Sequence, residues 1–595
     1  MDKTPVRLYE FGDFRLSVAE HALRQRGKLV LLQPKVFELL LALVENNGQE
    51  MRKTELMKRL WPDCYVADSN LTQSVFLLRK ALGQAQVESP LIVTIPGRGY
   101  RFAGELKIQR SETVSEQSIR SMAVLPFRII GNADVDNYLS LGLADALITK
   151  LSNLHEIAVR PTSAVLKFAD LTLDPLGAGR ELGVDSVLNG TLQQSDTRIR
   201  VTVQLARVHD GCLVWADMFE DDFVNIFALQ DAISELVGNA LAVKLTGEER
   251  ERVRKRYTDN HIAYRAYLKG RYYTNRWTQT SLSKAIESFQ YAIQMDPHYA
   301  LAYTGLSDAN YVLSELYNHP REVMPRAKLA ALKALDLDST LAEAHTSLAL
   351  VIGFYDWNWL EADREFRCAI DLNPSYAPAH VWHGRHLTTV GRFEEAITEL
   401  KLGLQLDPLS PMINAELGRT LFLAGQFDSA ITQLRETLEL EPNFWTAHMF
   451  LGWAYEQHGH LPEATAILHR AAILDRNART WASLAHACAI SGKKAEAIKI
   501  LQRLMGRSKK HYVSPYYIAG IYAALSSASE TYTWLEKAYE DKSEWLVWLK
   551  VDPKFDSLRT DQHFQDLVQR VLGSAAVSHE GLPKHPSLLS SSKAP

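Results

Sequence analysis

Residues 71–82 carry polar and basic side chains on one side and apolar side chains on the other. The polar and basic side chains can bind a nucleic acid. Apolar residues recur at i, i+4, i+7 and i+11, a spacing that aligns them along one face of an α-helix. These residues are Leu71, Val75, Leu78 and Leu82, and the opposite face carries Gln73, Phe76, Leu77 and Lys80. A glutamine amide can form two hydrogen bonds with an adenine edge, and an ammonium can neutralise a phosphate. We therefore expect a helix with one buried and one free face, capped by Asp68, Ser69 and Asn70 and ended by Gly83.

A β-hairpin with an arginine near its tip is predicted to follow this helix. Residues 91–95 (LIVTI) alternate like a strand, residues 96–99 (PGRG) have turn chemistry, and residues 100–102 (YRF) return as the partner strand. Arg98 therefore lies near the tip of the hairpin, and Arg101 lies on its second strand.

Two helices upstream would position the first one. Pro34 suits a first helical position, and an apolar stripe runs from Val36 to Val44 before the turn residues 46–48 (NNG). A second helix is predicted over residues 53–61, with Leu56, Met57 and Leu60 on its apolar side. Helix, helix, capped helix and hairpin in this order predict a winged helix-turn-helix, which is an α+β fold.

The same blocks resemble the DNA-binding domain of the OmpR/PhoB-type transcriptional regulators. The matching stretches are LLQPKVFELLLALVENNG, TELMKRLWPD, SNLTQSVFLLRKALG and VTIPGRGYRF, and they follow the order and spacing of that family. Residues 6–32 also read as short strands, with turns near residues 19–20 and 26–27, as in the family. The resemblance covers about the first 105 residues. It implies that the third helix enters the major groove of double-stranded DNA.

The resemblance also implies a set of DNA-contacting residues. Residues 70–80 of the third helix would lie nearest the DNA, and Arg98 would reach phosphates or the minor groove. Arg79 is as well explained by a salt bridge within the domain as by a DNA contact. The loop of residues 61–70 (WPDCYVADSN) would be the part that touches RNA polymerase. The full predicted set is Asn70, Thr72, Gln73, Phe76, Arg79, Lys80, Arg98 and Arg101.

Several features depart from the family pattern. Leu77 and Pro96 stand where many members carry an arginine, so Arg98 would replace the usual wing contact. The chain starts with the effector domain and shows no preceding receiver domain, so phosphorylation by a partner kinase is not implied. Residues 107–121 are polar where some relatives are tethered to the membrane. The sequence thus predicts a CadC-like effector domain without a membrane span, over residues 1–107, and a linker over residues 108–120.

Length and charge limit the function further. A chain of 595 residues is expected to hold several domains, since single cores stop growing at roughly 250–300 residues. Residues 1–107 hold 16 Lys and Arg against 12 Asp and Glu, and the remainder of the chain is acidic. Only the amino-terminal part therefore suits phosphate binding. We find neither a signal peptide nor a long apolar run, which predicts a cytoplasmic protein.

Four cysteines lie far apart, without the spacing of a metal site. We interpret Cys64, Cys212, Cys368 and Cys488 as reduced thiols, and we expect neither a metal nor a cofactor.

Residues 121–246 are predicted to form a compact α/β domain. Strands are expected near residues 122–127, 157–159, 185–188 and 213–215, and residues 199–205 alternate like a half-buried strand. Helices are expected over residues 138–154, 176–182 and 227–245. The domain is similar to TolB amino-terminal and flagellar FlgO-like domains through AVLPF, LADALITKLS, GRELGVDSVLNGTL and ALQDAISELVGNAL. Residues 247–259 are predicted to be a charged helical connector, more plausibly a solvated face than a second nucleic-acid contact.

A period of 34 residues governs residues 260–572. It relates the glycines 391, 425 and 459, the prolines 374, 408 and 442, and the alanines 396, 430 and 464. Each unit reads as two helices with small residues at their crossing and a proline after the second, which resembles the tetratricopeptide repeat. We expect roughly seven to eight repeats from about 260 to 550, a cap over residues 552–572 and a disordered tail over residues 573–595.

Stacked helix pairs form a superhelix with a concave groove that suits an extended peptide or a partner protein. Core packing between helices is the likelier role for most aromatic residues of the array, and no third ligand accompanies the histidine pair 383 and 386. Candidates for the groove are His380, His383, His386, Trp445, His448, Trp453 and Tyr455.

The sequence predicts a multidomain DNA-binding transcriptional regulator with a winged helix, a central α/β domain and an all-α repeat superhelix. The repeats and the α/β domain would sense a partner or ligand, and two chains would dimerise on tandem half-sites. The alternative is a protein-interaction scaffold whose winged helix no longer binds DNA specifically. An enzyme is not expected, because the sequence contains no P-loop, HExxH, GxSxG, GxGxxG or paired metal cysteines.

Overall fold

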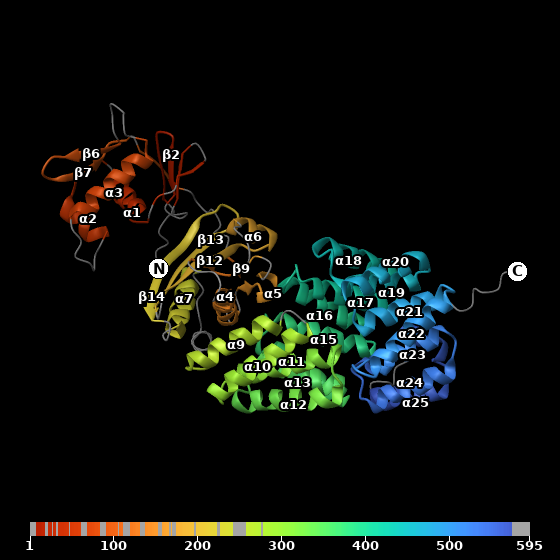
Figure 1. The fold of residues 1–595 in the computed structure, drawn as a ribbon. Helices are drawn as coiled ribbons and strands as arrows, with labels where there is room; N and C mark the ends of the chain where they lie inside the picture. The colour runs from red at the N-terminus through yellow and green to blue at the C-terminus, as the bar shows by residue number, and fades with distance from the viewer. Residues whose placement is uncertain are drawn as a thin grey trace. The chain divides into compact units, whose positions relative to one another are not determined.

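The computed structural model confirms a multidomain chain with a winged helix, a central mixed sheet and a helical repeat array (Figure 1). The structure describes residues 7–17, 22–25, 28–30, 32, 34–46, 48–60, 68–83, 91–104, 106–110, 119–130, 137–152, 157–165, 168, 174–195, 198–222, 226–241, 257–274 and 278–573.

An antiparallel sheet opens the winged-helix part, as the sequence predicts. Its strands are ordered β4-β3-β2-β1-β8, and β8 returns from beyond the hairpin to pair with β1. The predicted start of the linker at residue 108 is therefore wrong, because residues 108–110 belong to β8. The strands are β1 (Arg7–Phe11), β2 (Phe14–Ser17), β3 (Ala22–Gln25), β4 (Lys28–Val30) and β8 (Lys107–Arg110).

Three helices and a small sheet complete this part. The helices are α1 (Pro34–Glu45), α2 (Lys53–Leu60) and α3 (Asp68–Ala81). The second sheet has the order β5-β7-β6, from β5 (Met51–Arg52), β6 (Ile92–Ile95) and β7 (Gly99–Phe102). The predicted stripe of α3 is confirmed, since Leu71, Val75, Leu78 and Leu82 are all buried. Burial of this stripe fixes which face of α3 remains outside.

The central region contains a mixed sheet of the order β11-β9-β12-β13-β14, with β10 pairing in parallel with β12. The predicted alternation of residues 199–205 is confirmed by β13, where each second residue is buried. The strands are β9 (Ser121–Val124), β10 (Arg128–Ile129), β11 (Ala158–Val159), β12 (Ser186–Ser195), β13 (Arg198–Arg207) and β14 (Leu213–Asp222).

The helices of the central region are α4 (Asn137–Leu151), α5 (Thr162–Val165), α6 (Pro175–Glu181) and α7 (Ile226–Ala240). Helix α7 ends before residue 245, where the sequence predicts its end. Most of the predicted connector, residues 247–256, lies outside the described residues.

In the described part of the chain, residues 261–540 form eight helix pairs, which agrees with the seven to eight repeats expected. The first four pairs are α9 (His261–Thr274) and α10 (Gln279–Met295), α11 (Ala300–Leu316) and α12 (Pro320–Leu337), α13 (Ala342–Val351) and α14 (Trp359–Leu372), and α15 (Ala377–Val390) and α16 (Phe393–Leu406). The last four are α17 (Pro411–Leu423) and α18 (Phe427–Leu440), α19 (Trp445–Gln457) and α20 (Leu461–Leu474), α21 (Ala478–Ile490) and α22 (Lys494–Ser508), and α23 (Pro515–Ala524) and α24 (Ala528–Glu540). A π-helical turn, η4 (Ile352–Asp356), extends α13.

The repeated small residues allow the paired helices to cross closely, as the period predicts. A Cβ atom built on Gly418 would lie 2.5 Å from Leu434, and one built on Gly452 would lie 2.4 Å from Leu468. The alanines 396, 430 and 464 are fully buried at the same step. These positions leave no space for a larger side chain.

The residues after α24 fold back onto the array. They form η5 (Glu544–Trp548), η6 (Pro553–Leu558) and α25 (Gln562–Leu572), which we call the C-terminal segment (residues 544–572). The Lys550 ammonium donates to the Val390 carbonyl at 3.1 Å, and the Trp359 indole donates to the Val571 carbonyl at 3.0 Å. The C-terminal segment therefore reaches back to α14 and α15, and the contact with α14 comes from the predicted cap. None of the helices described is long and apolar enough to cross a membrane.

Candidate nucleic-acid interface

The outer face of α3 carries most of the residues predicted to bind DNA. Thr72, Gln73 and Lys80 are exposed, and Phe76 keeps 66% of its surface accessible. Asn70 belongs to α3, but its side chain lies outside the described residues. The face therefore presents an amide, a hydroxyl, an ammonium and an aromatic ring side by side on one helix.

Phe76 is the most distinctive residue of this face. A large aromatic side chain left open on an otherwise polar face is unfavourable in water and commonly marks a contact surface. In a major groove, its ring can pack against the methyl group of a thymine. Leu77 beside it is half-buried and packs against the core of the domain, so it is not part of the outward face on which the sequence placed it.

Arg79 ties α3 to the wing. Its guanidinium donates to the Ile92 carbonyl at 3.0 Å and to the Thr94 hydroxyl at 2.7 Å, and both acceptors belong to β6. For Arg79, the sequence predicts either a salt bridge within the domain or a DNA contact. The contact is within the domain, but its acceptors are a carbonyl and a hydroxyl. Arg79 thus sets the distance between the helix and the hairpin.

The wing presents two arginines. Arg98 lies in the turn between β6 and β7, with 71% of its side chain exposed, and its amide donates to the Ile95 carbonyl at 3.0 Å. Its guanidinium lies 3.7 Å from the Glu50 carboxylate. An exposed ion pair of this kind contributes little stability, so a phosphate can replace the carboxylate. Arg101 is exposed on β7, between the buried Tyr100 and Phe102.

A glycine fixes the base of the wing. A Cβ atom at Gly99 would lie 1.9 Å from the Met51 carbonyl oxygen, so β5 and β7 can pair here only if residue 99 has no side chain. Lys53 also donates its amide to the Arg98 carbonyl at 3.2 Å. The wing is therefore attached both to the start of α2 and, through Arg79, to α3.

The residues that the sequence proposed for the repeat groove mostly pack between helices. His380 contacts the Pro374 carbonyl at 3.0 Å and Glu399 at 2.7 Å, and His448 contacts the Pro442 carbonyl at 2.9 Å. Burial lowers the pKa of His386 to about 3. Within the residues described, no three His, Cys, Asp or Glu side chains are grouped to hold a metal ion.

Sequence reasoning missed a cluster of buried arginines on the inner side of the repeats. Arg385, Arg419 and Arg479 are each less than a tenth exposed, and their guanidinium groups stack on tryptophan rings. The 34-residue period could have revealed part of this cluster, because Arg385 and Arg419 are separated by one repeat, as Gly384 and Gly418 are.

Three segments of the chain match known protein families. Residues 27–102 match the family "Transcriptional regulatory protein, C terminal", and residues 117–236 match "HilA/YgeH-like transcriptional regulator, second domain". Residues 421–488 match the tetratricopeptide repeat. The predicted OmpR-type winged helix and the predicted repeats are thereby confirmed. The resemblance of the central domain to TolB and FlgO-like proteins stays a prediction.

The chain is similar to several whole proteins over part of its length. It is 24% identical to the transcriptional regulator HilA of Salmonella typhimurium over 394 residues, which are 65% of this chain and 68% of HilA. It is 29% identical to the putative adenylate cyclase 3 of Rhizobium meliloti over 238 residues, which are 39% of this chain and 40% of that protein. A solved structure, the DNA-binding domain of Escherichia coli CadC, is 26% identical, with a TM-score of 0.16, and the match covers 18% of this chain and 98% of that domain.

Proposed function

We propose that this chain is a sequence-specific DNA-binding transcriptional regulator. The observation that carries the proposal is the outer face of α3, which leaves an amide and an aromatic ring open beside an arginine-bearing wing. The family matches of residues 27–102 and 117–236 are both to transcriptional regulators, which supports the same class. The sequence motifs of common enzymes that we searched for do not occur in the chain, and catalysis is not part of the proposal.

In this proposal, α3 enters the major groove and its residues divide between bases and backbone. Gln73 and Phe76 read bases, with Asn70 and Thr72 beside them, and Lys80 neutralises a phosphate. Arg98 and Arg101 of the wing bind the backbone or the minor groove. Arg79 is assigned a positioning role, because its hydrogen bonds to β6 hold the wing at a fixed distance from α3.

The remaining parts of the chain would control DNA occupancy. We propose that the repeats and the central domain receive a partner or ligand in the cytoplasm and thereby alter dimerisation on tandem half-sites. A contact between residues 61–70 and RNA polymerase also belongs to the proposal, although residues 61–67 lie outside the described part of the structure. Substituting residues 61–67 by alanines, with residues 68–70 of α3 kept, should reduce activation of transcription while DNA affinity stays unchanged.

Selection of duplexes from a random pool by the full chain tests the proposal. A regulator should enrich one sequence motif, and the double variant Gln73→Ala, Phe76→Ala should lose that enrichment. A matched control is Lys35→Ala, which removes an exposed lysine of α1 that pairs with Glu38. Failure of the full chain to enrich any motif would instead support a protein-interaction scaffold whose winged helix no longer reads DNA.

A further inference from the structure

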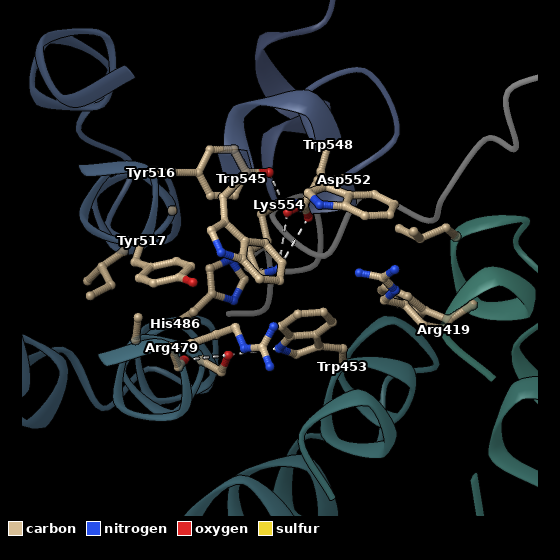
Figure 2. A pocket seen from close by; sticks show the side chains of 16 residues that line it. Arg419, Trp453, Arg479, His486, Tyr516, Tyr517, Trp545, Trp548, Asp552 and Lys554 are labelled. Carbon is tan, nitrogen blue, oxygen red and sulfur yellow. Dashed lines mark hydrogen bonds and ion pairs between the residues drawn. The ribbon is translucent and has the colours of Figure 1, made fainter. Parts of the chain in front are cut away.

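A cavity on the inner side of the repeats lies between four repeat helices and the C-terminal segment. The space free of atoms there, open solvent included, amounts to about 560 Å³. Helices α17, α19, α21 and α23 supply one side, and the residues from η5 to η6 supply the other (Figure 2). The residues used below are Arg419, Trp453, Arg479, Tyr517, Trp545 and Trp548.

Two buried arginines reach this cavity from different helices. Arg419 of α17 is 2% exposed and Arg479 of α21 is 7% exposed, and Figure 2 shows both guanidinium groups pointing toward the same space. The Arg419 guanidinium carbon lies 4.0 Å from the centre of a Trp548 ring, and that of Arg479 lies 4.6 Å from the centre of a Trp545 ring. These stacks hold the two charges in place, as cation–π contacts do.

The side chains around the cavity have hydrogen-bond donors without acceptors. The Nε atoms of Arg419 and Arg479 and the Nε1 atoms of Trp545 and Trp548 are buried, and no group in the described part of the chain accepts a hydrogen bond from them. Buried donors are normally paired, because an unpaired one loses its bond to water without replacement. Four such donors around one cavity call for a ligand that is rich in acceptors.

The buried arginines around the cavity outnumber the carboxylates that form ion pairs with them. Arg385, which stacks on the same two tryptophans, lies 3.0 Å from the Glu315 carboxylate, and Arg479 lies 3.7 Å from the same oxygen. Arg419 forms its ion pair with Glu416. Three buried arginines therefore share two carboxylates, and Arg385 and Arg479 pair with the same one.

A third carboxyl group, that of Glu544, also lies nearby. Burial, together with the neighbouring Glu315, raises the pKa of Glu544 well above its usual range. Neither oxygen of Glu544 receives a hydrogen bond within the described residues. Burial also lowers the pKa of Arg419 to about 10, with the other two arginines adding to the effect. An anion bound beside Arg419 would favour the charged guanidinium and so raise its pKa again.

We propose that this cavity binds a small carboxylate that carries one aromatic ring. The carboxylate would lie on the guanidinium groups of Arg419 and Arg479. The ring would lie among the aromatic walls, since Trp453, Tyr517 and Trp545 leave an apolar lining that an inorganic anion would not cover. An extended peptide is disfavoured, because the C-terminal segment already lines the same side of the array. The assignment does not depend on whether the chain binds DNA.

The bound ligand would also fasten the C-terminal segment to the repeats. Two of its contacts, Trp545 and Trp548, belong to η5, whereas Arg419 and Arg479 belong to the repeat helices. Binding therefore bridges the two parts, and it should raise the unfolding temperature of the full chain in proportion to the logarithm of ligand concentration above saturation.

Calorimetric titration of the full chain with phenylpropanoate, phenylpropanamide and butanoate tests the assignment, with thermal unfolding as a second measurement. Phenylpropanoate should bind and stabilise. The amide keeps the ring but lacks the charge, and butanoate keeps the charge but lacks the ring, so each should bind about tenfold more weakly or worse. Equal binding of the amide and the carboxylate, or no binding of phenylpropanoate, would overturn the proposal.

Two variants test the site itself. Arg419→Gln removes one guanidinium and should weaken phenylpropanoate binding by about tenfold or more. Gly520→Leu adds a side chain to the cavity without removing a charge. The backbone has room for it, because a Cβ atom there meets only Lys554 at 3.5 Å. This variant should also abolish binding. The exposed Arg435, which bonds to Tyr455 elsewhere, gives the control Arg435→Gln. Unchanged binding in folded Gly520→Leu would overturn the proposal even where Arg419→Gln fails to fold.

Discussion

We propose that, at the scale of single residues, Gln73 and Phe76 decide which duplex the chain prefers. Replacing Gln73 by alanine should cost about 1–3 kcal/mol of binding free energy on the preferred site and relax the preference at one base pair. Replacing Lys80, which we propose to bind a phosphate, should weaken binding to all duplexes alike. Competition binding with single-base variants of the selected site distinguishes the two patterns. A uniform loss for Gln73→Ala would contradict its assignment to bases.

A histidine held between two carboxylates gives the repeats a pH-dependent stability. The His383 imidazole lies 3.2 Å from Asp363 and 3.5 Å from Glu399. Burial alone would lower the pKa of His383, but hydrogen bonds with both carboxylates raise it above 6.5. Its hydrogen bond to Asp363 lowers the pKa of that group to about 2. Burial opposes the shift of Glu399, yet hydrogen bonds from His380 and His383 lower its pKa to about 2 as well.

The sign of each shift sets the pH range of this contribution. The carboxylates contribute fully above their unfolded values of 3.8 and 4.5 and lose their contribution as the pH falls toward 2. His383 contributes fully below 6.5 and loses its contribution as the pH rises through its raised pKa. The cluster should therefore stabilise most between about pH 4.5 and 6.5. Urea unfolding followed by tryptophan fluorescence should show His383→Gln flattening this dependence, and exposed His469→Gln should leave it unchanged.

The wing is held, at the scale of elements, by a glycine that cannot be replaced. Gly99→Ala would put a Cβ atom 1.9 Å from the Met51 carbonyl, so β5 and β7 must separate and Arg98 must move. We expect DNA affinity to fall by about tenfold or more, with part of the loss in domain stability. Electrophoretic mobility shift and amide exchange of residues 99–102 measure the two effects. Gly506→Ala in α22, where an added Cβ meets no atom, is the control and should change neither.

The sequence predicts some elements well and others poorly, for physical reasons. Periodicity reveals features that repeat within one element or from one repeat to the next. These features are the buried stripe of α3, the alternating burial along β13 and the 34-residue repeat. The strand β8 depends on pairing with β1 about a hundred residues earlier, which local pattern does not report. The partners of Arg79 and the arginine cluster are likewise set by tertiary packing. Leu77 and Phe76 lie at similar angles from the buried stripe, on opposite sides of it, so periodicity predicts that both face outward, and only tertiary packing half-buries Leu77.

At the scale of the whole molecule, the repeat array does not form an open groove, because the C-terminal segment lines its cavity. Because the C-terminal segment contacts α14 and α15, removing residues 544–572 should expose the buried faces of several helices. We expect the truncated chain to unfold at lower temperature and to bind a hydrophobic dye, while its winged helix keeps its DNA affinity. Scanning calorimetry and a mobility shift with the same preparation measure both. Loss of DNA affinity together with the segment would show that the winged helix depends on it.

The salt dependence of DNA binding by the full chain tests the central claim most directly. On the selected duplex, the logarithm of affinity should fall linearly with the logarithm of salt concentration, with a slope of about −0.9 for each phosphate neutralised. Arg98→Ala should reduce the size of that slope by about 1. An affinity that does not change with salt, or a slope that Arg98→Ala and Lys80→Ala both leave intact, would contradict a winged helix that binds a duplex through α3 and the wing.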